Sequence, residues 1–227
     1  MLDVIYEDNH ILVVIKPQNV PSQADSTNDL DMVYYVKEYL REKYNKQGNI
    51  YVGLVHRLDR PTGGVMVFAK TSKASERLSE QIRNKEMQKT YFAIVQGQPK
   101  EDKAYLKHYL LKNMKTNTVS VVPPLTTNAK MAELEYEVLD TENGKSLVKV
   151  NLFTGRSHQI RVQMKHIGTP VVNDAKYNAD NYRKGSKLCL WAYELNFVHP
   201  TTKQDMKFKV APPDFAPWTE FNCAKYI

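Results

Sequence analysis

The chain has 227 residues, of which 42% are hydrophobic and 25% are charged, a composition typical of a soluble globular protein. Its longest aliphatic run, residues 11–15, is far too short to cross a bilayer, and the acidic start does not resemble a signal peptide, so we expect a cytoplasmic protein without membrane contact. The net charge of +7 is uneven, because residues 1–31 hold one Lys and six Asp or Glu, a balance of −5, and the remainder carries +12. A basic body of this size suits binding to nucleic acid, although a basic surface that only maintains solubility fits equally well.

The first elements in the chain are two strands and a helix. Residues 5–6 and 11–15 predict two strands, because apolar and β-branched residues flank a polar turn. The next periodic segment predicts a helix that begins at a cap on Asp29 or Asp31 and ends at Gly48.

Asp59 lies in a dense cluster of charged residues on a predicted loop. Turn-forming residues fill the segment 56–64, and the apolar segment 65–69 after it predicts a short buried strand. Arg57 and Arg60 flank Asp59, and cations within reach lower the pKa of an aspartate by roughly 1–3 units. A carboxylate in this setting stays ionised, but an aspartate that only caps a turn also fits the local pattern.

The remaining elements are mostly strands. Residues 73–84 predict a helix capped by Thr71 or Ser72. Strands are then expected at residues 89–97, 105–111, 119–122, 132–138, 147–153, 188–197 and 206–210, the fourth of them with glutamates on a solvent-facing side. Many strands, few helices and no βαβ alternation predict an α+β fold with a mostly antiparallel mixed sheet flanked by helices, and the absence of a linker or repeat predicts a single domain, residues 1–227.

A third helix is expected after a cap at Ser157, with Ile160 and Met164 on its buried face. Helical spacing turns Arg161 by about 100° from that stripe, toward the edge of the buried face. Periodicity alone therefore favours a helix-surface arginine, with Arg156 just before the helix.

Several motifs resemble those of RluA-type RNA pseudouridine synthases. Residues 56–70, HRLDRPTGGVMVFAK, are similar to HRLDxxTSGxxxxAK in that family, with Gly63 in place of Ser; residues 154–163, TGRSHQIRVQ, are similar to TGRTHQIRVH; and Lys89-Thr90-Tyr91 is similar to Lys-x-Tyr. KPQNVPS, GTPVVNDAKY and LCLWAYELNFVHP resemble three further family motifs, with Asn19 in place of a Gly and Trp191 where the family often has His. The resemblance runs from about residue 3 to residue 215, without a counterpart of the small RNA-binding domain that many relatives carry in front.

The resemblance implies an enzyme that isomerises specific uridines in structured RNA to pseudouridine. Asp59 would be the catalytic carboxylate, Arg161 its ion-pair partner and Tyr91 the ring packed against the reacting base. The expected RNA-binding residues are His56, Arg57, Arg60 and Arg156, with Arg57 filling the space that the extruded uridine leaves. The rearrangement oxidises nothing and imports no group, so no cofactor is expected, and the substrate would be a stem-loop of rRNA or tRNA bound by a monomer.

Other classes of function have less support. A glycosidase needs a second acid in a comparable motif, and none accompanies Asp59. Six histidines form no HExxH motif, and Cys189 and Cys223 have no metal-ligand spacing, so no metal is expected. The main alternative is a catalytically inactive RNA-binding module of the same fold, against which the presence of Asp59, Tyr91 and Arg161 argues.

Overall fold

The computed structural model describes residues 2–227, which form two compact units. Unit 1 contains the residues up to Gln88 together with Glu194–Val210, and unit 2 contains Lys89–Tyr193 and Ala211–Ile227. Strand β10 (Leu190–Val198) contributes residues to both units. The expectation of a single domain over residues 1–227 stays a prediction.

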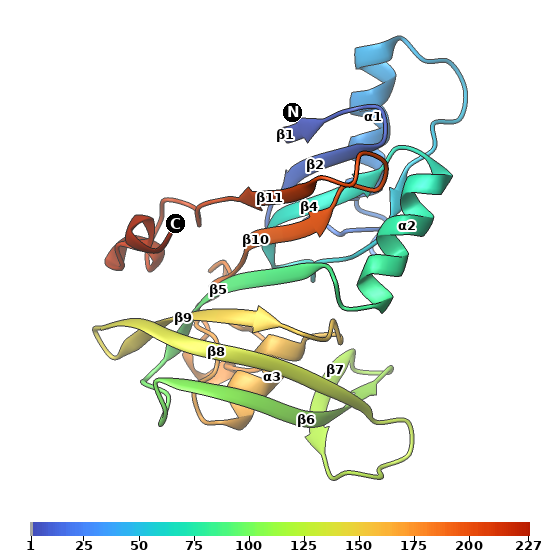
Figure 1. Cartoon of the computed structure of the whole chain (residues 1–227). Coiled ribbons are helices and arrows are strands. Elements are labelled where there is room, and N and C mark those ends of the chain that lie inside the picture. Colours follow the sequence, from blue (N-terminus) through green and yellow to red (C-terminus); the bar gives the residue numbers. More distant parts are fainter. Residues whose placement is uncertain (1) are drawn as a thin grey trace. The chain divides into compact units, whose positions relative to one another are not determined.

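Unit 1 is built on antiparallel strands (Figure 1). Its strands are β1 (Asp3–Glu7), β2 (Ile11–Lys16), β3 (Gly53–Leu54), β4 (Gly63–Ala69), the second part of β10, and β11 (Asp205–Lys209). They follow the order β1-β2-β4-β10, with β3 pairing to β4 and β11 pairing antiparallel to β10. Strand β3 is only two residues long.

Two helices belong to unit 1, and each begins at one of the predicted caps. In α1 (Met32–Tyr44) the side chain of Asp31 accepts a hydrogen bond from the backbone N–H of Tyr34. The helix ends at Asn45, whose left-handed φ of 48° stops it before the expected Gly48. In α2 (Ser72–Arg83) Thr71 is the capping residue and accepts from the backbone N–H of Ala74 at 3.2 Å.

All seven residues of β4 are buried, so this strand forms the centre of the unit 1 core. On one face of the sheet, α2 packs its buried side chains against the apolar side chains of β2, β4 and β10, a cluster that contains Ile11, Val13, Val65, Val67, Ala69, Ala74, Leu78, Leu195 and Phe197. At Gly53 a Cβ atom would lie 2.8 Å from Oγ of Ser75, so the close packing of α2 on β3 requires glycine there.

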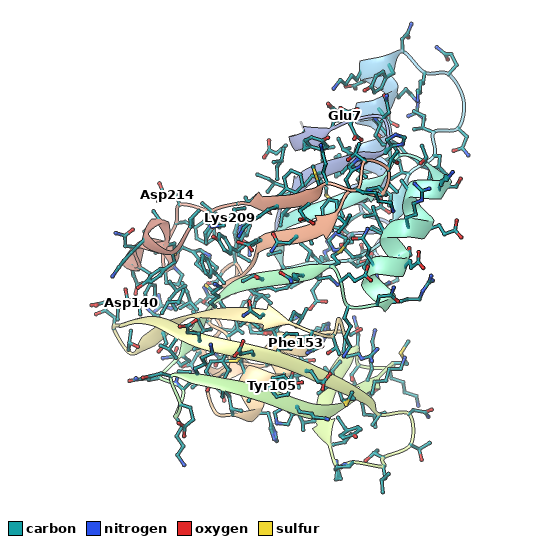
Figure 2. All side chains as sticks on the ribbon, viewed as in Figure 1. Glu7, Tyr105, Asp140, Phe153, Lys209 and Asp214 are labelled. Atoms are coloured by element: carbon teal, nitrogen blue, oxygen red, sulfur yellow. The ribbon has the colours of Figure 1, made fainter. Side chains whose placement is uncertain are left out.

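Glu7, at the end of β1, ties this strand to α1 (Figure 2). Its carboxylate accepts hydrogen bonds from Lys43, Lys70, Tyr39 and Tyr44 at 2.6–2.7 Å. Burial raises the pKa of Glu7, but these four donors outweigh it and bring the pKa to about 2. The carboxylate therefore stays ionised and fixes α1 on the edge of the sheet.

Unit 2 is a second antiparallel array, with α3 (Gln159–His166) behind its strands in the view of Figure 1. Its strands β5 (Gln88–Gln96), β6 (Lys103–Asn113), β7 (Thr118–Val122), β8 (Lys130–Glu142) and β9 (Lys145–Leu152) follow the order β5-β9-β8-β6-β7. Its core below α3 contains Leu110, Val119, Ala132, Val162 and Tyr177. The short 3₁₀ turns Ala179–Asn181, Trp218–Glu220 and Cys223–Tyr226 complete the unit.

The alternation in β8 is less regular than the sequence predicts. Glu137 is exposed as expected, but Glu133 is only 8% exposed. Tyr105 of β6 hydrogen-bonds to Glu133, and the Lys107 ammonium lies 3.8 Å from it, so the neighbouring strand covers this carboxylate. The Tyr105 ring itself lies beside that of Phe153, with centroids 5.8 Å apart (Figure 2).

These elements confirm the predicted α+β class and the largely antiparallel pairing. None of the helices within residues 2–227 has the length and apolar composition needed to span a membrane.

Candidate active site

Asp59 occupies a tight turn in unit 1. The backbone N–H of Thr62 donates to the carbonyl oxygen of Asp59 at 2.9 Å, which closes the four-residue turn that carries the carboxylate. Asp59 is half-buried, and β4 begins directly after the turn at Gly63. Gly64, the second residue of β4, has a φ of 123°, a backbone conformation that favours glycine, which explains the glycine at this position of the motif.

The segment from Lys16 to Ser22 holds this turn through its backbone. The ammonium of Lys16 donates to the carbonyl oxygens of Pro17, Arg60 and Thr62 at 2.9, 3.0 and 2.8 Å. Asn19 donates from its backbone N–H to the carbonyl of Arg60 at 2.8 Å. Its φ of 67° is left-handed, a conformation that asparagine tolerates better than most residues, which accounts for an asparagine at this turn.

A serine completes the support of the Asp59 turn. Ser22 is 5% exposed, and its Oγ donates to the carbonyl of Leu58 at 2.7 Å while accepting from the Leu58 N–H at 3.1 Å. The N–H and the C=O of Leu58, the residue before Asp59, are thus both hydrogen-bonded to the Ser22 hydroxyl. The carboxylate therefore sits on a backbone that is fixed at residues 58, 60 and 62.

The three other site residues predicted around Asp59 differ in their surroundings. His56 accepts a hydrogen bond at Nε2 from the backbone N–H of Val67 at 3.0 Å, so its ring is anchored to β4. Arg60 forms an ion pair with Asp29 and lies 3.8 Å from Asp25, which offsets its charge. Arg57 is exposed and contacts Gln23 at 3.3 Å. Among these three side chains, Arg57 is thus the most accessible to a bound polyanion.

Tyr91 belongs to unit 2, where it lies in the middle of β5. Its side chain is on the same face of the strand as Lys89, because residues two apart in a strand share a face. Tyr91 is 7% exposed. Burial lowers the pKa of the neighbouring Lys89.

Arg161, also in unit 2, is more deeply placed than helical periodicity predicts. It is 3% exposed rather than at the edge of the buried face. Its Nε donates to Oδ2 of Asp174 and its Nη2 to Oδ1 of Asp174, both at 2.7 Å. The sequence analysis assigned no role to Asp174, although this residue, 13 positions after Arg161, lies in the segment GTPVVNDAKY that resembles a family motif.

The cap predicted at Ser157 is wrong. The residue that precedes α3 is His158, which has a left-handed φ of 52° and makes no capping hydrogen bond with its side chain. Gln159 stabilises the turn instead: its Oε1 accepts from Thr154 Oγ1 and from the N–H of Arg156. Arg156 is exposed, and its Nε donates to the carbonyl of Met131 at 2.9 Å.

A family model described as RNA pseudouridylate synthase matches residues 10–166. The chain belongs to the RNA pseudouridylate synthase family. The matched segment contains the Asp59 turn, Tyr91, Arg156 and Arg161, so the family resemblance read from the motifs is confirmed.

Two curated relatives and one solved structure agree with membership of this family. The chain is 31% identical over 215 residues to a Helicobacter pylori protein named uncharacterized RNA pseudouridine synthase, covering 92% of this chain and 66% of the relative. It is 33% identical over 210 residues to the ribosomal large subunit pseudouridine synthase C of Vibrio vulnificus, covering 90% and 64%. The chain therefore spans about two thirds of the length of these relatives.

The solved structure of human RNA pseudouridylate synthase domain containing 4 matches with a TM-score of 0.78 at 22% identity, over 93% of this chain and 89% of that chain. At that level of identity the match shows the pseudouridylate synthase fold.

Within residues 2–227 no group of three or more His, Cys, Asp or Glu side chains is arranged to hold a metal ion.

Proposed function

We propose that this protein is an RNA pseudouridine synthase with Asp59 as its catalytic carboxylate. The observation that carries the proposal is the Asp59 turn, which lies inside the segment matched by the family and whose backbone is fixed by Lys16, Asn19 and Ser22. A rigid turn that presents a half-buried carboxylate suits a group that must be positioned against one atom of a substrate.

The reaction breaks the N1–C1′ bond of uridine, turns the base, and bonds C5 to C1′. The proton on C5 is lost and N1 gains one, so the product is an isomer of the substrate and no cofactor takes part. An ionised Asp59 could attack the sugar or the base, or abstract a ribose proton, and each route needs the carboxylate deprotonated at neutral pH.

We assign the remaining residues by their chemistry. Tyr91 offers an aromatic face that holds the released base while it rotates. Arg161, the second arginine of the motif at residues 154–163, is assigned as the cationic partner of Asp59. Arg57, which is exposed, fills the gap left when the uridine leaves its stack, a step that costs a few kcal/mol. We also assign His56, Arg60 and Arg156 to RNA binding. Substituting His56 or Arg60 should weaken RNA binding less than substituting Arg57, because His56 is hydrogen-bonded to β4 and Arg60 is paired with Asp25 and Asp29.

The RNA to test first is large-subunit rRNA, because the Vibrio vulnificus relative is named for that substrate. A stem-loop of tRNA is the second candidate. We further propose that the protein acts in the cytoplasm as a monomer.

The experiment measures tritium release from RNA labelled with [5-³H]uridine and isolated from cells that lack this gene. Asp59→Asn is expected to lower the rate by on the order of 10³-fold while RNA affinity stays close to that of the wild type, because the charge acts in chemistry. Asp205→Asn, an exposed aspartate at the start of β11, is the matched control and should keep full activity. The alternative, an inactive RNA-binding module, requires RNA binding by the wild type without tritium release.

A further inference from the structure

The buried pair between Arg161 and Asp174 is a charged contact within unit 2 that the proposed chemistry leaves unexplained. The side chains are 4% and 0% exposed, and two N–H groups of the guanidinium meet the two carboxylate oxygens in a parallel fork. Such bidentate contacts fix both distance and orientation.

Asp174 is itself held in place. Its Oδ1 also accepts from the backbone N–H groups of Lys176 and Tyr177 at 3.0 and 3.1 Å, and its carbonyl accepts from the N–H of Asn178 at 2.8 Å. The carboxylate thus closes the turn on which it lies. The position of Arg161 is therefore set by a group that cannot move independently of the backbone.

The flat face of the guanidinium is fixed as well. Its Cζ lies 5.1 Å from the centre of the Tyr177 ring, a cation–π contact. The Tyr177 hydroxyl accepts from the backbone N–H of Val119 at 2.8 Å and lies 2.7 Å from Nδ1 of His158. Asp174 and Tyr177 together hold one edge and one face of the guanidinium.

An arginine has five N–H donors, and the contact through Nε and Nη2 takes two of them. We propose that Asp174 is a positioning residue, which fixes the orientation of the Arg161 guanidinium for its proposed role in catalysis. The assignment rests on the proposed function, in which Arg161 serves Asp59.

A pair kept only for stability is the competing explanation, and the energetics do not favour it. Removing two charges from water costs several kcal/mol for each ion, and replacing buried ion pairs with apolar residues is often neutral or stabilising. A pair at 4% and 0% exposure therefore gains little as a stability device. Apolar residues could not orient the Arg161 guanidinium, so a role in orientation explains why a charged pair is buried here.

Asp174→Asn separates the two roles of the carboxylate. The amide oxygen takes the place of Oδ1 and keeps the bonds from Lys176 and Tyr177, so the turn persists. The amide NH₂ then stands at Oδ2 and meets the Nε–H of Arg161 donor to donor, which breaks half of the fork. We expect kcat for tritium release to fall on the order of 100-fold with little change in KM, because a displaced catalytic contact affects the chemical step.

The decisive measurement is a double-mutant cycle with Arg161→Lys, which keeps the positive charge but lacks the fork. If Asp174 acts through Arg161, adding Asp174→Asn to Arg161→Lys should change kcat by no more than about twofold. Glu220→Gln, which removes a carboxylate from the Lys145–Glu220 pair of unit 2, is the matched control and should leave kcat unchanged. All variants are assayed at a temperature at which circular dichroism shows them folded.

Two results would overturn the assignment while leaving the proposed function intact. One is an active wild type with an unimpaired Asp174→Asn variant. The other is a full 100-fold loss from Asp174→Asn in the Arg161→Lys background, which would mean that Asp174 only supports its loop. A wild type that releases no tritium would instead overturn the proposed function, and this role with it.

Discussion

Lys16 is a charged residue with no solvent-exposed surface, placed directly beneath the Asp59 turn. Burial lowers the pKa of Lys16 to about 7; the Asp59 carboxylate raises it and the Arg60 guanidinium lowers it further. An ammonium has three donors for the three carbonyl oxygens that it contacts, whereas a neutral amine has two. The protonated form is therefore the one that satisfies the whole turn.

The depressed pKa of Lys16 predicts how stability depends on pH. The unfolded chain keeps the proton of Lys16 up to about pH 10.5, while the folded protein releases it near pH 7, so between these values the unfolded state binds more protons. The free energy of unfolding of the wild type minus that of Lys16→Met should therefore rise between pH 7 and pH 10, by at most about 1.4 kcal/mol per pH unit. Urea denaturation at four pH values measures this difference, with Lys73→Met, an exposed lysine in α2, as the control. A difference that stays constant or falls over this pH range would contradict the lowered pKa of Lys16.

At the scale of elements, the polar segment before α1 acts as a support for the turn before β4. Ser22 satisfies the N–H and the C=O of Leu58 with one hydroxyl, and Gln18 donates from Nε2 to the carbonyl of Pro61 at 3.0 Å. These contacts join segments about 40 positions apart, which the antiparallel pairing of β2 with β4 brings together. The placement of Asp59 is thus a consequence of strand pairing.

Ser22→Ala tests this support. The substitution leaves two backbone groups of Leu58 without their partner, so the free energy of unfolding should fall by about 1–3 kcal/mol. It should also lower kcat more than it changes RNA affinity, because the residue next to Leu58 is the proposed catalytic carboxylate. Chemical denaturation and tritium release measure the two effects. Ser72→Ala, at the exposed start of α2, should change neither beyond about 0.5 kcal/mol.

Most elements could be predicted because their signals are local. Asp31 and Thr71 cap their helices as short-range rules require, and the apolar run of β4 is buried throughout. The start of α3 could not be predicted, because Gln159 replaces a serine cap through contacts with Thr154 and with the carbonyl of Glu133.

For the candidate site, the motifs identified which residues to consider but not how they are held. The support of the Asp59 turn by Lys16 depends on contacts more than 40 positions away in the chain. The fork between Arg161 and Asp174 depends on how the loop after α3 folds back. Neither set of contacts leaves a periodic pattern in the sequence, so neither could be predicted before the fold was known.

At the scale of the whole molecule, charge is distributed in a way that bears on RNA binding. The first 31 residues carry −5, and part of that charge offsets cations of unit 1, since Asp25 and Asp29 lie beside Arg60 and Glu7 accepts from Lys43 and Lys70. The residues beyond 31 carry +12, and the part of this surplus that is not offset in these pairs is available for phosphates. An anionic polymer is thus attracted by the later part of the sequence.

This charge predicts a steep dependence of RNA binding on salt. Each neutralised phosphate of a single strand contributes roughly −0.7 to the slope of log affinity against log salt, so a footprint of several phosphates should give a slope of several units, with activity at low substrate falling as salt rises. Binding of a uridine-containing stem-loop is measured over a salt series, with a neutral polymer as the control ligand. Arg57→Ala, measured beside the wild type, should lower turnover more than it changes the slope, because Arg57 is proposed to act after docking, when the base leaves its stack. A basic surface that serves only solubility predicts a shallow slope and no preference for RNA, and that result would remove RNA as the substrate while leaving the family fold in place.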